Sequence, residues 1–300
     1  MSIINNAGAG SQIRLLCLID RVLNRRRQKP IARDDLIEQL RPEVLPDSAN
    51  GKQRLPRNLD FWIEEGLWKS DASGISSKYV TANESDLPAR VLRLLIENEK
   101  GNLLTGLRGE QFLLGITALL LHDQFTFRGN SLLVREKVSP SVGPLLVDSN
   151  AGEDERRTIN DSEDKELLSY GRFLGFLEPL MNGFILDPTR AITPVLPNVF
   201  NHDSHLPMKE FMVRLAECLP MLDGGRYRQE VGPLMDNIGA GHNERHQISK
   251  AVSHALIRLE TSMVISFESL SDDKDALSLQ KPDGSLRQVS SITLREVMGK

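Results

Sequence analysis

The chain of 300 residues is 40% hydrophobic and 26% charged, and its formal net charge is −4 at pH 7. This length and apolar content allow two or three domains with substantial cores. The near-balanced charge excludes a protein that coats nucleic acid through bulk positive charge, because that mode of binding needs a large excess of Lys and Arg.

The apolar segments do not indicate export or membrane insertion. The N-terminal region lacks a basic segment before its apolar part, which Asp20 and Arg21 interrupt, so no signal peptide is expected. The longest apolar run, residues 112–121, is about half of what a bilayer-spanning helix needs, and it predicts a buried helix. We expect a cytoplasmic protein without membrane contact, in which Cys17 and Cys218 are buried, unpaired thiols.

Residues 1–82 have the pattern of three helices followed by a hairpin. Amphipathic helices are predicted at 13–23 and 32–42. A third is predicted to begin near Arg54, because Pro56 is tolerated only in the first turn, and to end at Gly66. The segments LWKS and SSKYV then flank a Gly-containing turn. Three helices and a hairpin in this order predict a winged-helix domain.

Two groups of basic residues in this domain are candidates for contact with duplex DNA. One group follows the first helix, and the other lies at the start of the third, where the helix dipole also favours an anion. We expect both groups to contact phosphates, although such residues are also common on ordinary solvated surfaces. The candidates are Arg25, Arg26, Arg27, Lys52, Arg54 and Arg57.

Residues 83–200 are predicted to form a mainly helical domain that connects the two ends of the chain. The segments at 87–98, 109–125 and 166–180 are too apolar to be linkers. By contrast, residues 149–166 are acidic and lack apolar periodicity, which predicts an exposed loop. A strand followed by a helix is predicted near Asp187, which is a plausible helix cap before Pro188.

Residues 201–300 repeat the order of elements found at the N-terminal end. Helices are predicted at 207–222, around 230–238 and at 244–262, and the strand VISFES follows the last helix at once. A second strand, ALSLQ, follows an acidic turn. This order predicts a second winged helix. Its third helix has an apolar stripe that should face the core, formed by Ile248, Val252, Leu256 and Leu259.

The opposite face of this third helix is polar and basic. Small polar and basic residues on such a face suit contact with phosphates and base edges in the major groove. The candidate DNA contacts are Lys250, Ser253, His254 and Arg258. Acidic residues in the following turn would repel a phosphate backbone, so docking of a protein is the alternative; they are Asp272, Asp273 and Asp275.

No motif in the sequence indicates catalysis. The chain contains neither a GxxxxGK[ST] phosphate loop nor a GxSxG nucleophile elbow. His242 and His246 lack the glutamate that directly follows the first histidine of a zinc helix, and His202 and His205 lack further ligands. We therefore expect a protein that is not an enzyme and that binds no metal or cofactor.

Four segments carry a resemblance to a known family. LDPTRAITPVLPNVF, FMVRLAECLP, MLDGGRYRQEV and SKAVSHALIRLE resemble the DpdG proteins of bacterial 7-deazapurine DNA-modification islands. The resemblance covers most of the chain and is densest over residues 186–265. It implies a role in the restriction half of such a system, in antiviral defence alongside helicase-like and nuclease-like partners that attack unmodified phage or plasmid DNA. It carries over no active-site residue.

The sequence thus predicts a mainly α protein with small β-hairpins: winged-helix domains at 1–82 and 201–300, joined by a helical domain at 83–200. The expected function is that of a DNA-binding or adaptor subunit of a defence complex. A protein-interaction scaffold without DNA contact and a winged-helix transcriptional regulator are the alternatives. The identity of the partner subunits and homo-oligomerisation are left open.

Overall fold

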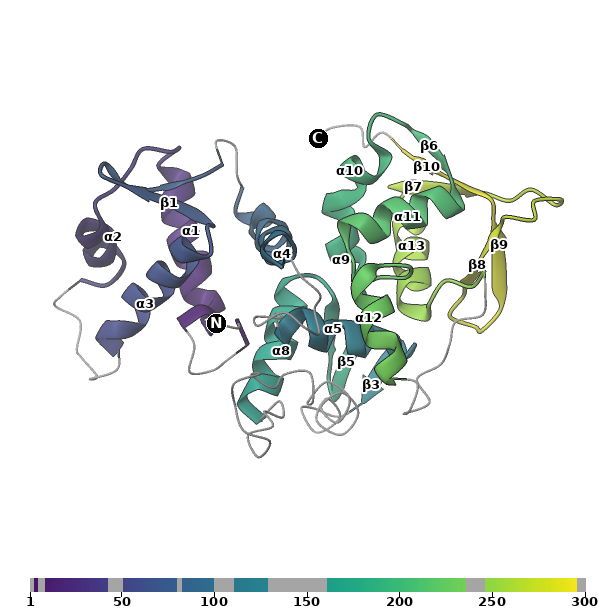
Figure 1. The fold of residues 1–300 in the computed structure, drawn as a ribbon, viewed down its shortest axis with the longest axis horizontal. Coiled ribbons are helices and arrows are strands. Elements are labelled where there is room, and N and C mark those ends of the chain that lie inside the picture. The colour runs from purple at the N-terminus through teal and green to yellow at the C-terminus, as the bar shows by residue number, and fades with distance from the viewer. Residues whose placement is uncertain are drawn as a thin grey trace. The chain divides into compact units, whose positions relative to one another are not determined.

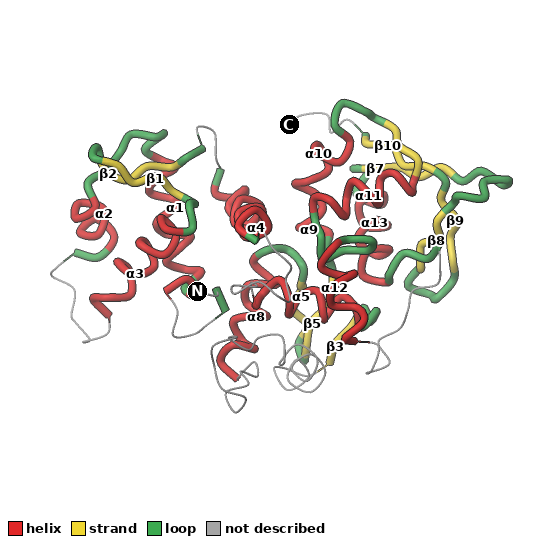
Figure 2. Tube along the Cα trace, in the orientation of Figure 1, coloured by secondary structure: helices red, strands yellow, loops and turns green. Residues whose placement is uncertain are grey.

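The computed structural model describes residues 3–4, 9–42, 51–79, 83–99, 111–128, 161–235 and 246–295. It combines helices with small antiparallel sheets, as Figures 1 and 2 show. The chain divides into two compact units, residues 1–100 and 101–300, which are taken in turn. The predicted acidic loop at 149–166 lies mostly outside the described residues, which resume at 161.

The first unit contains the predicted three helices and hairpin. They are α1 (Ile13–Arg25), α2 (Arg33–Leu40), α3 (Gly51–Glu64), β1 (Trp68–Asp71) and β2 (Gly74–Ser77), preceded by a 3₁₀ turn at Ala9–Ser11. A second 3₁₀ turn (Glu84–Asp86) leads into α4 (Leu87–Asn98). The predicted start of the third helix near Arg54 is wrong, since α3 begins at Gly51 and contains Pro56. Pro56 is the sixth residue of α3, so it lacks the N–H that would bond to the carbonyl of residue 52, and the helix gives up one backbone hydrogen bond there.

The core of the first unit lies between α1, α3 and the hairpin. Leu16 and Ile19 of α1 pack in the same core as Trp62 of α3, and all three are completely buried. Ile31 forms an antiparallel bridge with Ile75 of β2, with backbone bonds of 2.9 and 2.8 Å. The spatial order is therefore Ile31, β2, β1.

The second unit begins with two predicted helices and with a sheet of which the sequence predicted only the strand before Asp187. α5 (Gln111–Leu121) is buried from Phe112 to Leu121, as predicted, and α8 (Asp161–Phe173) packs against it. β3 (Thr126–Arg128), β4 (Leu177–Leu180) and β5 (Gly183–Leu186) form a sheet in the order β3-β5-β4. The segment predicted to be mainly helical therefore also contains a small sheet. Among the described helices, none is both long and apolar enough to cross a membrane.

The rest of the second unit forms another three-stranded sheet with an additional hairpin. After α9 (Thr189–Ile192), a 3₁₀ turn (Thr193–Val195) and α10 (Leu196–Phe200) come β6 (His205–Pro207), α11 (Met208–Cys218), α12 (Arg226–Met235) and α13 (Lys250–Thr261). The strands β7 (Ile265–Glu268) and β10 (Ser291–Leu294) join β6 in the order β6-β10-β7.

The predicted pairing of the strand after α13 is wrong. β7 was expected to pair with the next strand, but β8 (Leu277–Gln280) pairs with β9 (Leu286–Val289) instead. The Asp283-Gly284 turn, with Gly284 at a φ of 82°, closes this tight hairpin. β7 is left to pair with β10, Ile292 lying opposite Phe267.

One strand topology recurs three times in the described residues. In each copy, a strand or bridge residue pairs with the last strand, and the last strand pairs with a strand that directly follows a helix. The helices that directly precede these strands are α3, α8 and α13. The copies are unequally spaced along the chain, which explains why no repeat of fixed period is visible in the sequence.

The ends of these three helices share a detailed backbone motif. Gly66, Gly175 and Met263 adopt left-handed conformations with φ of 90°, 89° and 58°. The N–H group of the next residue bonds back over five residues in each case, at 2.9, 2.8 and 2.9 Å. This is the Schellman arrangement, whose left-handed position is usually Gly. Met263 is therefore the strained member of the three.

Both cysteines are free, as predicted, but they are only partly buried, so the prediction of buried thiols is wrong. Each lies at the border of its apolar stripe, where a helical side chain is partly open to solvent. Burial, aided by the nearby Asp20 charge, raises the pKa of Cys17, and burial raises that of Cys218. Both thiols are thus held in their protonated, less reactive form.

Candidate functional site

The outer surface at the start of α3 carries exposed cations. Leu55, Leu59 and Trp62 point into the core, and this orientation leaves Arg54 and Arg57 exposed on the other side of the helix. Lys52 belongs to the same helix, but its side chain lies outside the described residues. The structure therefore presents Arg54 to solvent one turn from the start of α3, where the helix dipole is positive, and Arg57 to solvent near the middle of the helix.

The second predicted basic group is partly occupied by contacts of its own. Arg25 lies within 3.9 Å of Glu84, although its side chain is 75% exposed. The Arg26 guanidinium donates hydrogen bonds to the carbonyls of Lys29 and Pro30, at 3.3 and 3.2 Å. Arg27 is exposed and adopts a left-handed backbone with φ of 49°.

The two predicted basic groups do not form one patch. The Gln28 side chain donates to the carbonyl of Lys78, just beyond β2, at 3.4 Å. Lys78 in turn lies beside Gly66, directly after α3. Residues 25–27 are thus near the end of α3, whereas Arg54 is near its start. A helix of 14 residues is about 20 Å long, so the groups lie near opposite ends of it.

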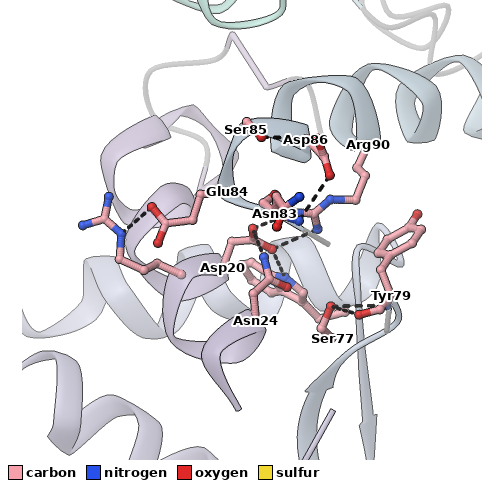
Figure 3. Close-up of polar contacts among 11 residues, drawn as sticks. Asp20, Asn24, Ser77, Tyr79, Asn83, Glu84, Ser85, Asp86 and Arg90 are labelled. Atoms are coloured by element: carbon pink, nitrogen blue, oxygen red, sulfur yellow. Dashed lines mark hydrogen bonds and ion pairs between the residues drawn. The ribbon is translucent and has the colours of Figure 1, made fainter. Parts of the chain in front are cut away.

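A buried ion pair, missed by the sequence reading, fastens α4 to this unit (Figure 3). Arg90 of α4 donates two hydrogen bonds to Asp20 of α1, at 3.0 and 2.7 Å, and both side chains are buried. Trp68 of β1 and Asn24 also donate to Asp20, at 3.2 and 2.7 Å. The sequence did contain a signal for this pair, because Asp20 lies within the apolar stripe of a predicted helix. A carboxylate at a buried position is normally paired with a cation.

The apolar stripe of α13 is confirmed, but the outward placement of Ser253 and His254 is wrong. Ile248, Val252, Leu256 and Leu259 are all buried, as predicted. Ser253 is also completely buried, and its hydroxyl donates to the Ile248 carbonyl and accepts from the Gln280 N–H.

The remaining face of α13 packs against the preceding repeat. The His254 ring is 8% exposed and lies edge-on to Phe125, with ring centroids 4.0 Å apart. Burial, with a contribution from Lys250, lowers the pKa of His254. The neutral ring thus belongs to an internal contact and cannot reach a DNA groove in this conformation.

Carboxylates of neighbouring segments surround the basic residues of α13. Arg258 forms an ion pair with Asp187, whose side chain is 1% exposed. Asp123 accepts a hydrogen bond from the Lys250 N–H at 2.7 Å and lies 3.9 Å from Lys250 Nζ. Asp223 accepts from the Ser249 N–H at 2.6 Å. Two carboxylates therefore already occupy the start of α13, and they would repel a phosphate.

Asp187 also accepts hydrogen bonds at the start of α9, although the N-cap position predicted for it is taken by Pro188. Its Oδ1 accepts a hydrogen bond from the Thr189 N–H at 3.0 Å at the start of α9, and the Thr189 hydroxyl donates to the same atom. No group of three or more His, Cys, Asp or Glu side chains in the described part of the chain is arranged to hold a metal ion.

Comparison with known proteins gives one match. A family model described as DpdG-like matches residues 1–273, which include the whole first unit and most of the second. The resemblance noted over residues 186–265 is thereby confirmed. No curated protein and no solved structure matches the chain.

Proposed function

Because the chain belongs to the DpdG-like family, we propose that it is a non-catalytic DNA-binding or adaptor subunit of the restriction machinery linked to bacterial 7-deazapurine DNA modification. Its partners in this proposal are other proteins of that system, including helicase-like and nuclease-like subunits, and duplex DNA. The family match supports a role in the 7-deazapurine modification system, and the surface of the first unit supports the contact with DNA.

In this proposal the repeated strand topology is that of a winged helix, and the first unit supports it best. In the first unit the elements follow as helix, bridge residue, helix, helix and hairpin, and the bridge residue pairs with the second strand of the hairpin. In DNA-binding proteins with a helix-turn-helix core, the recognition helix enters the major groove near its N-terminal end. In the first unit that end of α3 bears Arg54 and Arg57.

The observation that carries the proposal is the exposure of Arg54 and Arg57 on the N-terminal half of α3. The described residues include no ion pair to either guanidinium, so both remain available to phosphate oxygens. Lys52 and the group at Arg25, Arg26 and Arg27 are retained as further candidates. Ser253 and His254 are not, because both are buried.

The test is duplex binding measured by fluorescence anisotropy over a range of salt concentrations. The triple charge reversal Lys52→Glu, Arg54→Glu, Arg57→Glu should abolish binding without lowering the melting temperature greatly, since exposed charges contribute little to stability. A control with three reversals at exposed positions of the second unit should bind like the parent: Lys165→Glu, Arg172→Glu, Lys274→Glu. Binding by the triple variant equal to that of the parent would refute the placement of the site.

A scaffold role for the second unit is supported by a separate observation. Large apolar side chains are exposed there, including Met181 (99%), Met263 (69%) and Leu270 (65%). Exposed apolar side chains favour protein contacts. In the adaptor form of the proposal, the first unit binds DNA and the second docks the other subunits. Co-purification with those subunits in the absence of DNA tests this division, and loss of all co-purification after nuclease treatment would contradict it.

A further inference from the structure

A second group of cations in the first unit lies along the β1–β2 hairpin and the turn beside it. This group, the hairpin-edge cluster, consists of Arg27, Lys29, Lys69 and Lys78, all exposed. Trp68 and Ser77 face the core from paired positions of the hairpin, so the alternation of strand side chains directs Lys69 and Lys78 to the opposite, outer face. The bond from Gln28 to the Lys78 carbonyl brings Arg27 and Lys29 to the same edge.

The cluster holds four cations and has one close acidic neighbour, Asp71, whose charge interacts with that of Lys69. Within the described ranges, no carboxylate lies within ion-pair distance of any of the four side chains. Asp71, at the end of β1, is engaged by the Ser73 N–H at 2.8 Å and by the Ser73 hydroxyl. Glu65 accepts a hydrogen bond from Asn98 at 3.0 Å. The cluster therefore has charge available for an external polyanion.

The position of the cluster relative to α3 indicates which polyanion fits. Lys78 lies beside Gly66 at the end of α3, whereas Arg54 lies one turn from its start. Gly66 lies twelve residues beyond Arg54 and nine beyond Arg57, so the two cationic groups are separated by roughly 14–18 Å along the helix. The major groove of a duplex is about 12 Å wide and has a phosphate backbone on each side. A helix in that groove with cations at both ends can meet both backbones, which a single strand does not offer.

We propose that the hairpin-edge cluster binds the second phosphate backbone of a DNA duplex whose first backbone contacts Arg54 and Arg57. This inference rests on the proposed function, and it adds a second contact site and a preference for double-stranded over single-stranded DNA. The second contact site is independent of the first, because none of Lys29, Lys69 and Lys78 takes part in the contact made by Arg54 and Arg57.

The test compares the salt dependence of binding for the parent and for Lys69→Gln, Lys78→Gln. Each lost phosphate contact lowers the slope of log K against log salt by about 0.9 on a duplex, so this variant should show a slope smaller by about 1.8. The preference for duplex over a single strand of equal length should fall with it. The matched control is Lys165→Gln, Arg172→Gln, which removes the same charge from exposed positions of the second unit and should keep the parental slope.

The outcomes separate this inference from the proposed function. If the parent does not bind duplex DNA at low salt, both fail. If Arg54→Gln, Arg57→Gln weakens binding while Lys69→Gln, Lys78→Gln keeps the parental slope, only the second contact site is refuted. An equal loss of slope in the control, or an equal loss on single strands, would show a general charge effect and would also overturn the inference.

Discussion

Replacing Arg258 by alanine should destabilise the second unit, although the side chain is 58% exposed. The reason is its partner: Asp187 is 1% exposed, and its Oδ2 has no hydrogen-bond partner among the described residues apart from this ion pair. Leaving a buried charge unpaired costs about 3–5 kcal/mol. The open side of Arg258 lets water reach the vacated space, and Thr189 still bonds to Oδ1. We therefore expect a loss of about 2–3 kcal/mol.

Lys250→Ala is the matched comparison. Lys250 Nζ is 3.9 Å from Asp123, and the stronger contact, from the Lys250 backbone N–H to Asp123 at 2.7 Å, survives the substitution. The cost should therefore stay within roughly 0.5 kcal/mol, as for other exposed ion pairs. Sequence reasoning alone would give the same small value for both residues, so the difference between them depends on the tertiary structure.

Urea unfolding followed by circular dichroism measures both effects. The double variant Arg258→Ala, Asp187→Asn should recover much of the loss, because a buried amide needs no counter-charge and Oδ1 can still accept from Thr189. A cost for Arg258→Ala of less than about 0.5 kcal/mol would refute the reasoning. So would a double variant that is no more stable than the single one.

Two further predictions concern the helix ends and the buried histidine. Gly175→Ala should cost at least about 2 kcal/mol, because the φ of Gly175 is 89° and a Cβ there would lie 2.7 Å from the Ala191 nitrogen. Met263→Gly should stabilise the protein by up to about 1 kcal/mol, because glycine adopts the left-handed backbone without strain. Urea unfolding measures both changes, and a loss of stability in Met263→Gly would contradict the strain argument. His254 has a lowered pKa when folded, so the unfolded chain takes up a proton first: its contribution to stability should be present above pH 6.5 and fall progressively as the pH drops below that value. His254→Gln should remove that part of the pH dependence, and an unchanged profile would show that His254 does not cause it.

Local periodicity predicted the helices and their inward faces well. The stripe formed by Ile248, Val252, Leu256 and Leu259 is buried as expected, because a repeat of three to four residues fixes one face of a helix regardless of its surroundings. The chain order of three helices and a hairpin in residues 1–82 is likewise a local property. The helix start at Gly51 shows the limit, since a proline restricts a boundary without fixing it.

The repeat in the middle of the chain was harder to detect. Its sheet joins β3 to β5 across more than fifty residues, and strands of three or four residues leave little periodic signal. The left-handed glycines at 66 and 175 were a usable sign, each directly before a short apolar segment. The third copy has Met263 at that position, which hides the correspondence from sequence comparison.

The sequence by itself determined which residues of α13 face their own core, because side chains on one helix keep fixed angular positions relative to one another. It could not determine what covers the opposite face. That depended on Phe125, Asp123 and Asp187, which lie far from α13 along the chain and reach it only once the second unit has folded. The same polar and basic pattern is compatible with a DNA surface or with an internal contact. Only the tertiary structure, by supplying Phe125 and the carboxylates of Asp123 and Asp187, buried His254 and paired Lys250 and Arg258 within the unit.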